Sequence, residues 1–238
     1  ASDAGIEIQV AIRTHDLPYQ FSPQALAEAD AFGTEIRPSA ISNRVDLRDL
    51  PFVTIDGADA RDFDDAVCAQ AKGRGGWTLW VAIADVAHYV TPGSALDEAA
   101  IERGTSVYFP SEVLPMLPET LSNGLCSLNP NVDRLALAVQ MEIASTGRLT
   151  SYRFEEIVFR SKQRLTYEQV QSALDAVDST DLGRKELVEA LQKTPVFSSP
   201  EIGAGIGELY VLYRMLRSQR EDRGALDFDS VEPAFQFD

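Results

Sequence analysis

Residues 51–55 read Pro51-Phe52-Val53-Thr54-Ile55 and are followed at once by Asp56-Gly57-Ala58-Asp59-Ala60-Arg61-Asp62-Phe63-Asp64-Asp65. The apolar run predicts a buried strand, and five aspartates crowd the ten residues after it. Two unit charges about 4 Å apart repel by roughly 4 kcal/mol at an effective dielectric near 20, so these carboxylates cannot all stay ionised and close without a counter-charge. Arg61 supplies one at most. The pattern therefore predicts a site for Mg²⁺, with Mn²⁺ as the other candidate, because both ions prefer carboxylate and water oxygens.

The spacing of the acids indicates which of them can converge. Asp56 ends the predicted strand, and Gly57 gives the following turn the freedom to fold back, so that Asp62, Asp64 and Asp65 return to the same place. Four carboxylates can hold two cations about 3.5–4 Å apart, the arrangement used for in-line displacement at phosphorus. An Asp-rich loop can also be a solvated turn or a structural Ca²⁺ site, although the acids miss the EF-hand pattern.

Composition bounds the class of protein. The chain has 238 residues, enough for one large domain or two small ones, and 45% of them are hydrophobic, as in globular proteins. No apolar run is long enough for a membrane span, and the first residues lack the features of a signal peptide. Cys68 and Cys126 lie among apolar residues, which suits reduced thiols in a cytoplasm. A net charge of −16 argues against bulk attraction to nucleic acid, so an RNA substrate would need cations from a metal or from basic domains outside this chain.

Hydrophobic patterning predicts an α+β fold with a twisted mixed or antiparallel sheet flanked by helices, because strands and helices occur in blocks. We expect a strand over 6–13 and a polar linker over 38–48, with a domain boundary near residue 45. Two hairpins are predicted, one from 66–69 and 77–84, the other from 134–144 and 148–160. Helices are predicted from Ser22 to Gly33 and over 94–103, 166–177, 182–193 and 205–222, and short strands over 225–229 and 234–237.

The run from Thr54 to Val67 closely resembles the signature of the ribonuclease II/ribonuclease R family, the RNB-type 3′→5′ exoribonucleases. Further segments resemble the family in the same order, and the match is dense over about residues 46–170. The sequence of Gly57–Phe63 is more similar to the ribonuclease R branch than to ribonuclease II. The additional segments are Trp80–Val86, Val107–Pro110, Pro115–Glu119 and Leu121–Leu128.

The resemblance implies roles for particular residues. Asp56 and Asp65 match family aspartates that would bind the more firmly held Mg²⁺, while Asp62 and Asp64 would serve a second ion and the attacking water. Tyr108 matches the family tyrosine that stacks on the 3′-terminal base, and stacking suits a sequence-independent enzyme. Its aromatic partner would be Phe235 or Phe237, although alternating residues on a short strand are more often core.

The resemblance also implies that residues 46–238 are the N-terminal part of an RNB catalytic domain, preceded by an extension or linker over 1–45. The family's Ser-Pro-x-Arg-Arg-Tyr segment, whose arginine contacts the scissile phosphate, does not occur here, so the chain alone can be inactive. The leading hypothesis is a metal-dependent hydrolytic exoribonuclease that releases nucleoside 5′-monophosphates from single-stranded RNA 3′ ends. Two alternatives stay open: a metal-dependent phosphomonoesterase using Asp62-Phe63-Asp64, and a non-catalytic RNA-binding module of the same fold.

Overall fold

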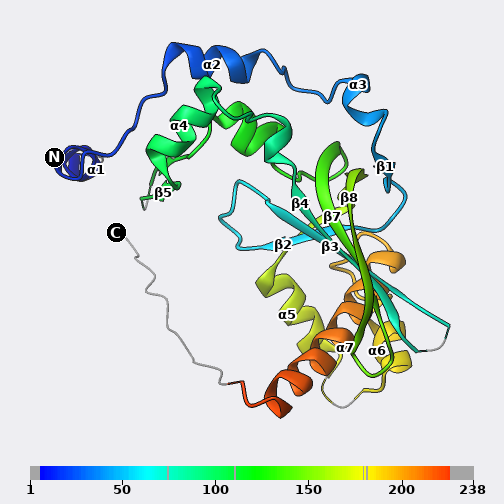
Figure 1. Cartoon of the computed structure of the whole chain (residues 1–238). Helices are drawn as coiled ribbons and strands as arrows, with labels where there is room; N and C mark the ends of the chain where they lie inside the picture. Colours follow the sequence, from blue (N-terminus) through cyan, green and yellow to red (C-terminus); the bar gives the residue numbers. More distant parts are fainter. Residues whose placement is uncertain (1–5, 74, 110, 179, 181, 226–238) are drawn as a thin grey trace. The chain divides into compact units, whose positions relative to one another are not determined.

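The computed structural model describes residues 6–73, 75–109, 111–178, 180 and 182–225. The chain divides into two compact units (Figure 1). One is formed by residues 36–85 and 126–226 and contains the main sheet. The other is formed, among the described residues, by 6–35, 86–109 and 111–125. Each unit is described by itself below.

The main sheet has seven strands among the described residues, in the order β1-β8-β7-β4-β3-β2-β9. Its four central pairings are antiparallel, whereas β1 pairs with β8 and β9 pairs with β2 in parallel at the two edges. The expected mixed sheet is therefore confirmed. The strands are β1 (Val45–Asp46), β2 (Val53–Asp56), β3 (Asp65–Ala71), β4 (Trp77–Ala84), β7 (Asp133–Ile143), β8 (Leu149–Arg160) and β9 (Gln163–Thr166).

Both predicted hairpins form at the centre of this sheet. β3 and β4 pair from Asp65↔Ile83 to Ala71↔Trp77, and β7 and β8 pair from Asp133↔Arg160 onward. The turns contain Gly75 (φ +85°) and Gly147 (φ +78°), and this backbone region strongly favours glycine. Local pairing across short turns thus builds the four strands at the middle of the sheet.

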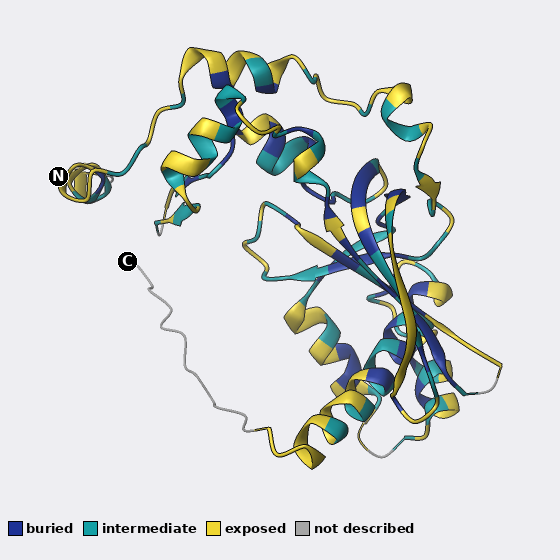
Figure 2. Cartoon of the chain, in the orientation of Figure 1, coloured by how far each residue is buried: buried dark blue, intermediate teal, exposed yellow. Residues whose placement is uncertain are grey.

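Three helices of the same unit pack against the sheet: α5 (Tyr167–Ala176), α6 (Arg184–Leu191) and α7 (Pro200–Asp222) (Figure 1). Two of them, α5 and α7, begin at residues whose side chains cap the helix. Thr166 forms a capping box with Gln169, and Ser199 caps α7 ahead of Pro200. Their buried faces form one apolar cluster with the strands, which Figure 2 shows as the dark segments of these helices. The cluster comprises Val53, Leu165, Ala173, Leu174, Leu187, Leu191, Phe197, Ile202 and Ile206.

A buried polar contact fixes α7 and α6 on the sheet. Trp77 Nε1 donates to Glu208 at 2.7 Å, and Arg184 Nε donates to the same carboxylate at 2.9 Å. The Arg184 guanidinium also lies 4.3 Å from the Trp77 ring centroid. Because Glu208 is 9% exposed, its charge needs these partners, and they hold both helices to β4.

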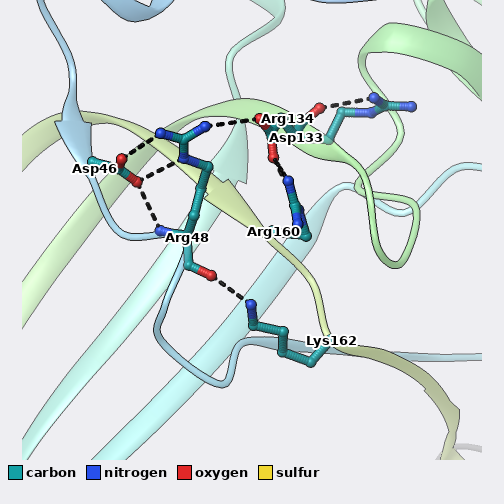
Figure 3. Close-up of polar contacts among 6 residues, drawn as sticks. All are labelled: Asp46, Arg48, Asp133, Arg134, Arg160 and Lys162. Carbon is teal, nitrogen blue, oxygen red and sulfur yellow. Dashed lines mark hydrogen bonds and ion pairs between the residues drawn. The ribbon is translucent and has the colours of Figure 1, made fainter.

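Charged side chains tie the segment before β2 to the edge of the sheet (Figure 3). The carboxylate of Asp133 accepts from Arg160 at 2.7 Å and from Arg48 at 3.1 Å. Arg48 also donates to Asp46, and its carbonyl oxygen accepts from Lys162. Strands β1, β7 and β8 and the chain entering β2 are therefore connected through one network.

The second unit contains α1 (Ile6–Thr14), α2 (Pro23–Asp30), η1 (Val86–His88), α4 (Ala95–Arg103), the strand pair β5 (Val107–Tyr108) and β6 (Val113–Leu114), and the π-helical turn η2 (Thr120–Leu125). Within it, α2 and α4 pack together. Glu28 accepts from the backbone N–H groups of Ala95 and Leu96 at 3.1 and 3.0 Å, and Arg103 lies 3.7 Å from the Phe21 ring centroid. The N-terminal residues 21–30 are therefore built into this unit.

Some predictions need correction. Residues 6–13 were predicted as a strand, but Ile6–Thr14 is helix α1. None of the described strands pairs with this segment, and a helix satisfies its own backbone groups. The stretch 38–48, predicted as a linker, contains the short helix α3 (Pro38–Ile41) and β1.

Other predicted boundaries moved or fall outside the described residues. Helix α7 begins five residues before the predicted start at 205. The predicted strands 225–229 and 234–237 lie, except for residue 225, outside the described residues. The division at residue 45 stays a prediction. Among the described residues, no helix is both long and apolar enough to cross a membrane.

Candidate active site

The aspartate loop connects two neighbouring strands at one end of the sheet. Asp56 is the last residue of β2, and Asp65 is the first residue of β3. The two strands pair antiparallel at Val53↔Val67, so residues 57–64 span the end of this pair. The predicted apolar strand is confirmed, because Phe52 and Val53 are buried at its start.

The C-terminal half of the loop is anchored by backbone hydrogen bonds. Phe63 is 3% exposed, its N–H donates to Ser127 Oγ at 3.0 Å, and its carbonyl oxygen accepts from Leu128 N–H at 2.8 Å. The carbonyl oxygen of Asp64 accepts from Ala84 N–H at 2.8 Å. These contacts fix the backbone between Asp62 and Asp65. The motif around Leu121–Leu128 thus contributes Ser127 and Leu128, whose anchoring role the sequence did not reveal.

The N-terminal half of the loop turns back on itself. Gly57 N–H donates to Asp56 Oδ1 at 2.7 Å, and Ala60 N–H donates to Gly57 carbonyl oxygen at 3.2 Å. The second contact closes a turn over Gly57–Ala60. The chain therefore folds back between Asp56 and Asp62, as the spacing predicts.

The four predicted acids interact through their charges. The pKa of Asp64 is raised, first by burial and then by the charges of Asp62, Asp65 and Asp56. The pKa of Asp65 is raised by burial and by Asp56. Asp59 is not among the charges that raise either pKa. The repulsion expected from the sequence therefore acts among the predicted quartet.

The donor set fits a hard divalent cation. Carboxylate oxygens are what Mg²⁺ prefers, and a cation at this place would relieve the repulsion that raises the pKa of Asp64. In the part of the chain that the structure describes, no three His, Cys, Asp or Glu side chains converge as a metal-binding group. Assignment of Asp56, Asp62, Asp64 and Asp65 as ligands therefore stays a prediction.

Tyr167 is a neighbour of the acids that the sequence reasoning missed. It opens α5 directly after β9, whose residue Thr166 pairs with Asp56. Its pKa is raised by burial and by the charges of Asp56 and Asp65, which places its hydroxyl within their field. The sequence offers little indication of this proximity, because β9 and β2 are distant in sequence.

The predicted base-stacking residues lie outside the compact unit that holds the four acids, or outside the described residues. Tyr108 ends β5 in the second compact unit and is 65% exposed. Phe235 and Phe237 lie outside the described residues. The proposed stack thus stays a prediction.

The mixed sheet carries its carboxylate loop between β2 and β3, and the RNB domain family model matches residues 44–238. The chain belongs to the RNB family. It is similar to ribonuclease R of Vibrio parahaemolyticus serotype O3:K6, with 51% identity over 233 residues, covering 98% of this chain and 26% of that protein. The chain spans about a quarter of the length of the curated relatives it matches.

Solved structures agree with this assignment. Mycoplasma genitalium RNase R in complex with double-stranded RNA has a TM-score of 0.79 and 29% identity, covering 95% of this chain and 37% of that one. Yeast Ssd1, described as a pseudonuclease, has a TM-score of 0.60 over 92% of this chain and 30% of that one. At 16% identity, this second likeness shows the fold alone.

Proposed function

We propose that this chain is the metal-binding part of a hydrolytic 3′→5′ exoribonuclease that releases nucleoside 5′-monophosphates. The observation that carries the proposal is Asp64, whose pKa is raised first by burial and then by three further carboxylates at the end of the sheet of an RNB domain. Such crowding costs stability and is typical of sites that bind a cation or tune proton transfer. The similarity to ribonuclease R selects RNA hydrolysis from among those uses.

In this proposal Asp56, Asp62, Asp64 and Asp65 hold Mg²⁺, or Mn²⁺ in its place. The bound ion supplies a lowered pKa for the attacking water and charge stabilisation for the departing ribose 3′-oxygen. The carboxylates fix the position of the scissile phosphate relative to that water. The anchored backbone at Phe63 keeps Asp62 and Asp64 in place, so little reorganisation is needed on substrate binding.

RNA would be held through features that do not depend on base identity. Tyr108, with Phe235 or Phe237, would stack on bases at a single-stranded 3′ end, since every base has a π-face. The charge of −16 means that most phosphate contacts come from basic domains elsewhere in the longer protein. A cytoplasmic location accords with the two buried free cysteines, Cys68 and Cys126.

The fold and the four aspartates bear on the two alternative functions, a phosphomonoesterase and a non-catalytic RNA-binding module. The phosphomonoesterase hypothesis requires a doubly wound parallel sheet, and the antiparallel pairing of β2, β3, β4 and β7 disfavours it. The RNA-binding hypothesis has a precedent in fold, because the pseudonuclease Ssd1 shares it. The retained quartet of Asp56, Asp62, Asp64 and Asp65 favours catalysis.

The test uses the intact protein with 5′-labelled poly(A) and Mg²⁺. Wild type should shorten the RNA from its 3′ end and release AMP. Asp64→Asn should lower the rate by about 100-fold or more, since it removes a charge that organises the transition state, while RNA binding persists. Asp59→Asn, the same change in the same loop, serves as the matched control and should keep its activity. Unimpaired degradation by Asp64→Asn would defeat the proposal.

A further inference from the structure

Arg164 reaches the aspartate loop from the edge strand β9. Its position pairs with Thr54 of β2, two residues before Asp56. The terminal nitrogen Nη2 donates to the carbonyl oxygen of Ala58 at 2.9 Å and to that of Ala60 at 3.1 Å. One side chain therefore binds both arms of the turn that carries the chain from Asp56 to Asp62.

The same guanidinium contacts the anchored half of the loop. Its central carbon lies 4.5 Å from the centroid of the Phe63 ring, within the range of a cation–π contact. The backbone of Phe63 is held by hydrogen bonds with Ser127 and Leu128. Arg164 thus connects the turn at Ala58 and Ala60 with Phe63, the anchored residue of the loop.

This bridge matters because the acids repel one another. Asp62 lies between Ala60 and Phe63, the two residues that Arg164 connects, and Asp64 follows Phe63 directly. Repulsion within the quartet pushes the loop open, whereas hydrogen bonds from a charged donor to two carbonyl oxygens close it. A planar guanidinium can stack on the ring and donate along its edge at the same time, which an ammonium group cannot do equally well.

We propose that Arg164 is a positioning residue that keeps the backbone of the aspartate loop folded, so that its carboxylates can gather around a divalent cation. The inference rests on the proposed function for its catalytic consequence, but its structural part stands on these contacts alone. Arg164 would act through the backbone of Ala58 and Ala60 and the ring of Phe63, and would set the direction of Asp62 and Asp64. It would thereby make the metal site available before RNA arrives.

The experiment compares Arg164→Met and Arg164→Lys with the wild-type intact protein. Arg217→Met is the matched control, because Arg217 is an exposed arginine on α7 that hydrogen-bonds to Tyr213 and Glu221. The first measurement is amide hydrogen exchange of residues 57–63 without metal. The second is Mg²⁺ affinity by calorimetry, and the third is kcat and KM on poly(A) against Mg²⁺ concentration.

In Arg164→Met, loop amides such as that of Ala60 should exchange about tenfold faster, and Mg²⁺ affinity should fall about tenfold, as expected for losing hydrogen bonds from a charged donor. The Mg²⁺ concentration for half-maximal kcat should rise similarly, while KM for RNA changes by less than about twofold. Arg164→Lys should recover part of each effect. Arg217→Met should match wild type throughout.

These measurements either support or overturn the positioning role of Arg164. Wild-type loop exchange and Mg²⁺ affinity in Arg164→Met would overturn it, as would faster exchange with unchanged affinity. If Arg164→Met fails to fold, Arg164→Lys decides in its place: a folded lysine variant with wild-type exchange and affinity overturns the inference. If wild type degrades no RNA but Arg164→Met still loosens the loop and weakens Mg²⁺ binding, the proposed function fails and the positioning role holds.

Discussion

Removing the charge of Asp64 is predicted to stabilise the protein when no divalent cation is present. Burial, followed by the charges of Asp62, Asp65 and Asp56, raises the pKa of this carboxyl. A raised pKa means that the ionised form is less favourable in the folded chain than in the unfolded chain. Asp64→Asn removes this cost while keeping the shape of the side chain.

The size of this stabilisation depends on how far Asp64 is exposed to solvent and on how many charged carboxylates interact with it. Neighbouring atoms desolvate the Asp64 carboxyl in part, but the residue as a whole is still exposed, so solvent screens its interactions with the three other carboxylates to roughly 0.2–1 kcal/mol each. Together they amount to about 1 kcal/mol, because screening and side-chain freedom favour the lower end of that range. In a chain of this length, about 1 kcal/mol raises Tm by roughly 2–4 °C.

The pH dependence has a definite sign. Well below the ordinary aspartate pKa of 3.8, the Asp64 carboxyl is protonated in both folded and unfolded chains, so it carries no charge penalty. As pH rises through the raised folded pKa, wild type loses this stability and the gap to Asp64→Asn opens. Thermal unfolding followed by circular dichroism in EDTA, between about pH 4 and 8, measures that gap.

Mg²⁺ should reverse the order of the two proteins. A ligand that binds only the folded state raises the free energy of unfolding by about 2.7 kcal/mol at one hundred times its Kd. Asp64→Asn should be stabilised less by Mg²⁺ than wild type, because it lacks one of the proposed ligands. Asp59→Asn is the control and should show neither the gap in EDTA nor the reversal. A lower Tm for Asp64→Asn than for wild type in EDTA, or a gap independent of pH, would refute the reasoning.

Two further predictions concern the scaffold. Gly203→Ala should cost about 1–3 kcal/mol in urea denaturation, because its Cβ would lie 2.3 Å from the carbonyl oxygen of Leu191. Gly205→Ala, two positions along α7 with nothing within 4 Å, should instead gain up to about 1 kcal/mol, and equal effects would contradict this packing. Asp133→Asn should cost about 1–2 kcal/mol at neutral pH. Burial alone would raise the pKa of Asp133, but hydrogen bonds from Arg160 and Arg48 lower it, so this stability is present above the ordinary value and disappears as acid titrates the folded carboxylate.

Local features of the fold could be predicted from the sequence. Both central hairpins follow from short turns with glycine between alternating strands, and the helix starts at Ser22, Ser94 and Thr166 follow from capping residues. The loop between Asp56 and Asp65 was also recognisable, since its spacing and family signature are contiguous. These features depend on contacts between residues close in the chain.

Features that depend on distant contacts were not predictable in the same way. The parallel pairing of β9 with β2 brings Arg164 and Tyr167 beside the aspartate loop, although about one hundred residues separate them. No local pattern encodes that pairing. The strand predicted at 6–13 failed for a related reason, because alternation alone does not supply a partner strand, and the segment forms α1 instead.

The central claim is that the carboxylates of Asp56, Asp62, Asp64 and Asp65 share one divalent cation site. The most direct measurement is a crystal structure of the intact protein grown with Mn²⁺, with the ion located by its anomalous scattering. The account predicts an anomalous peak within about 2–2.5 Å of oxygens from at least two of these side chains, and its loss in Asp64→Asn. Bound Mn²⁺ elsewhere, with these four carboxylates directed apart into solvent, would contradict it.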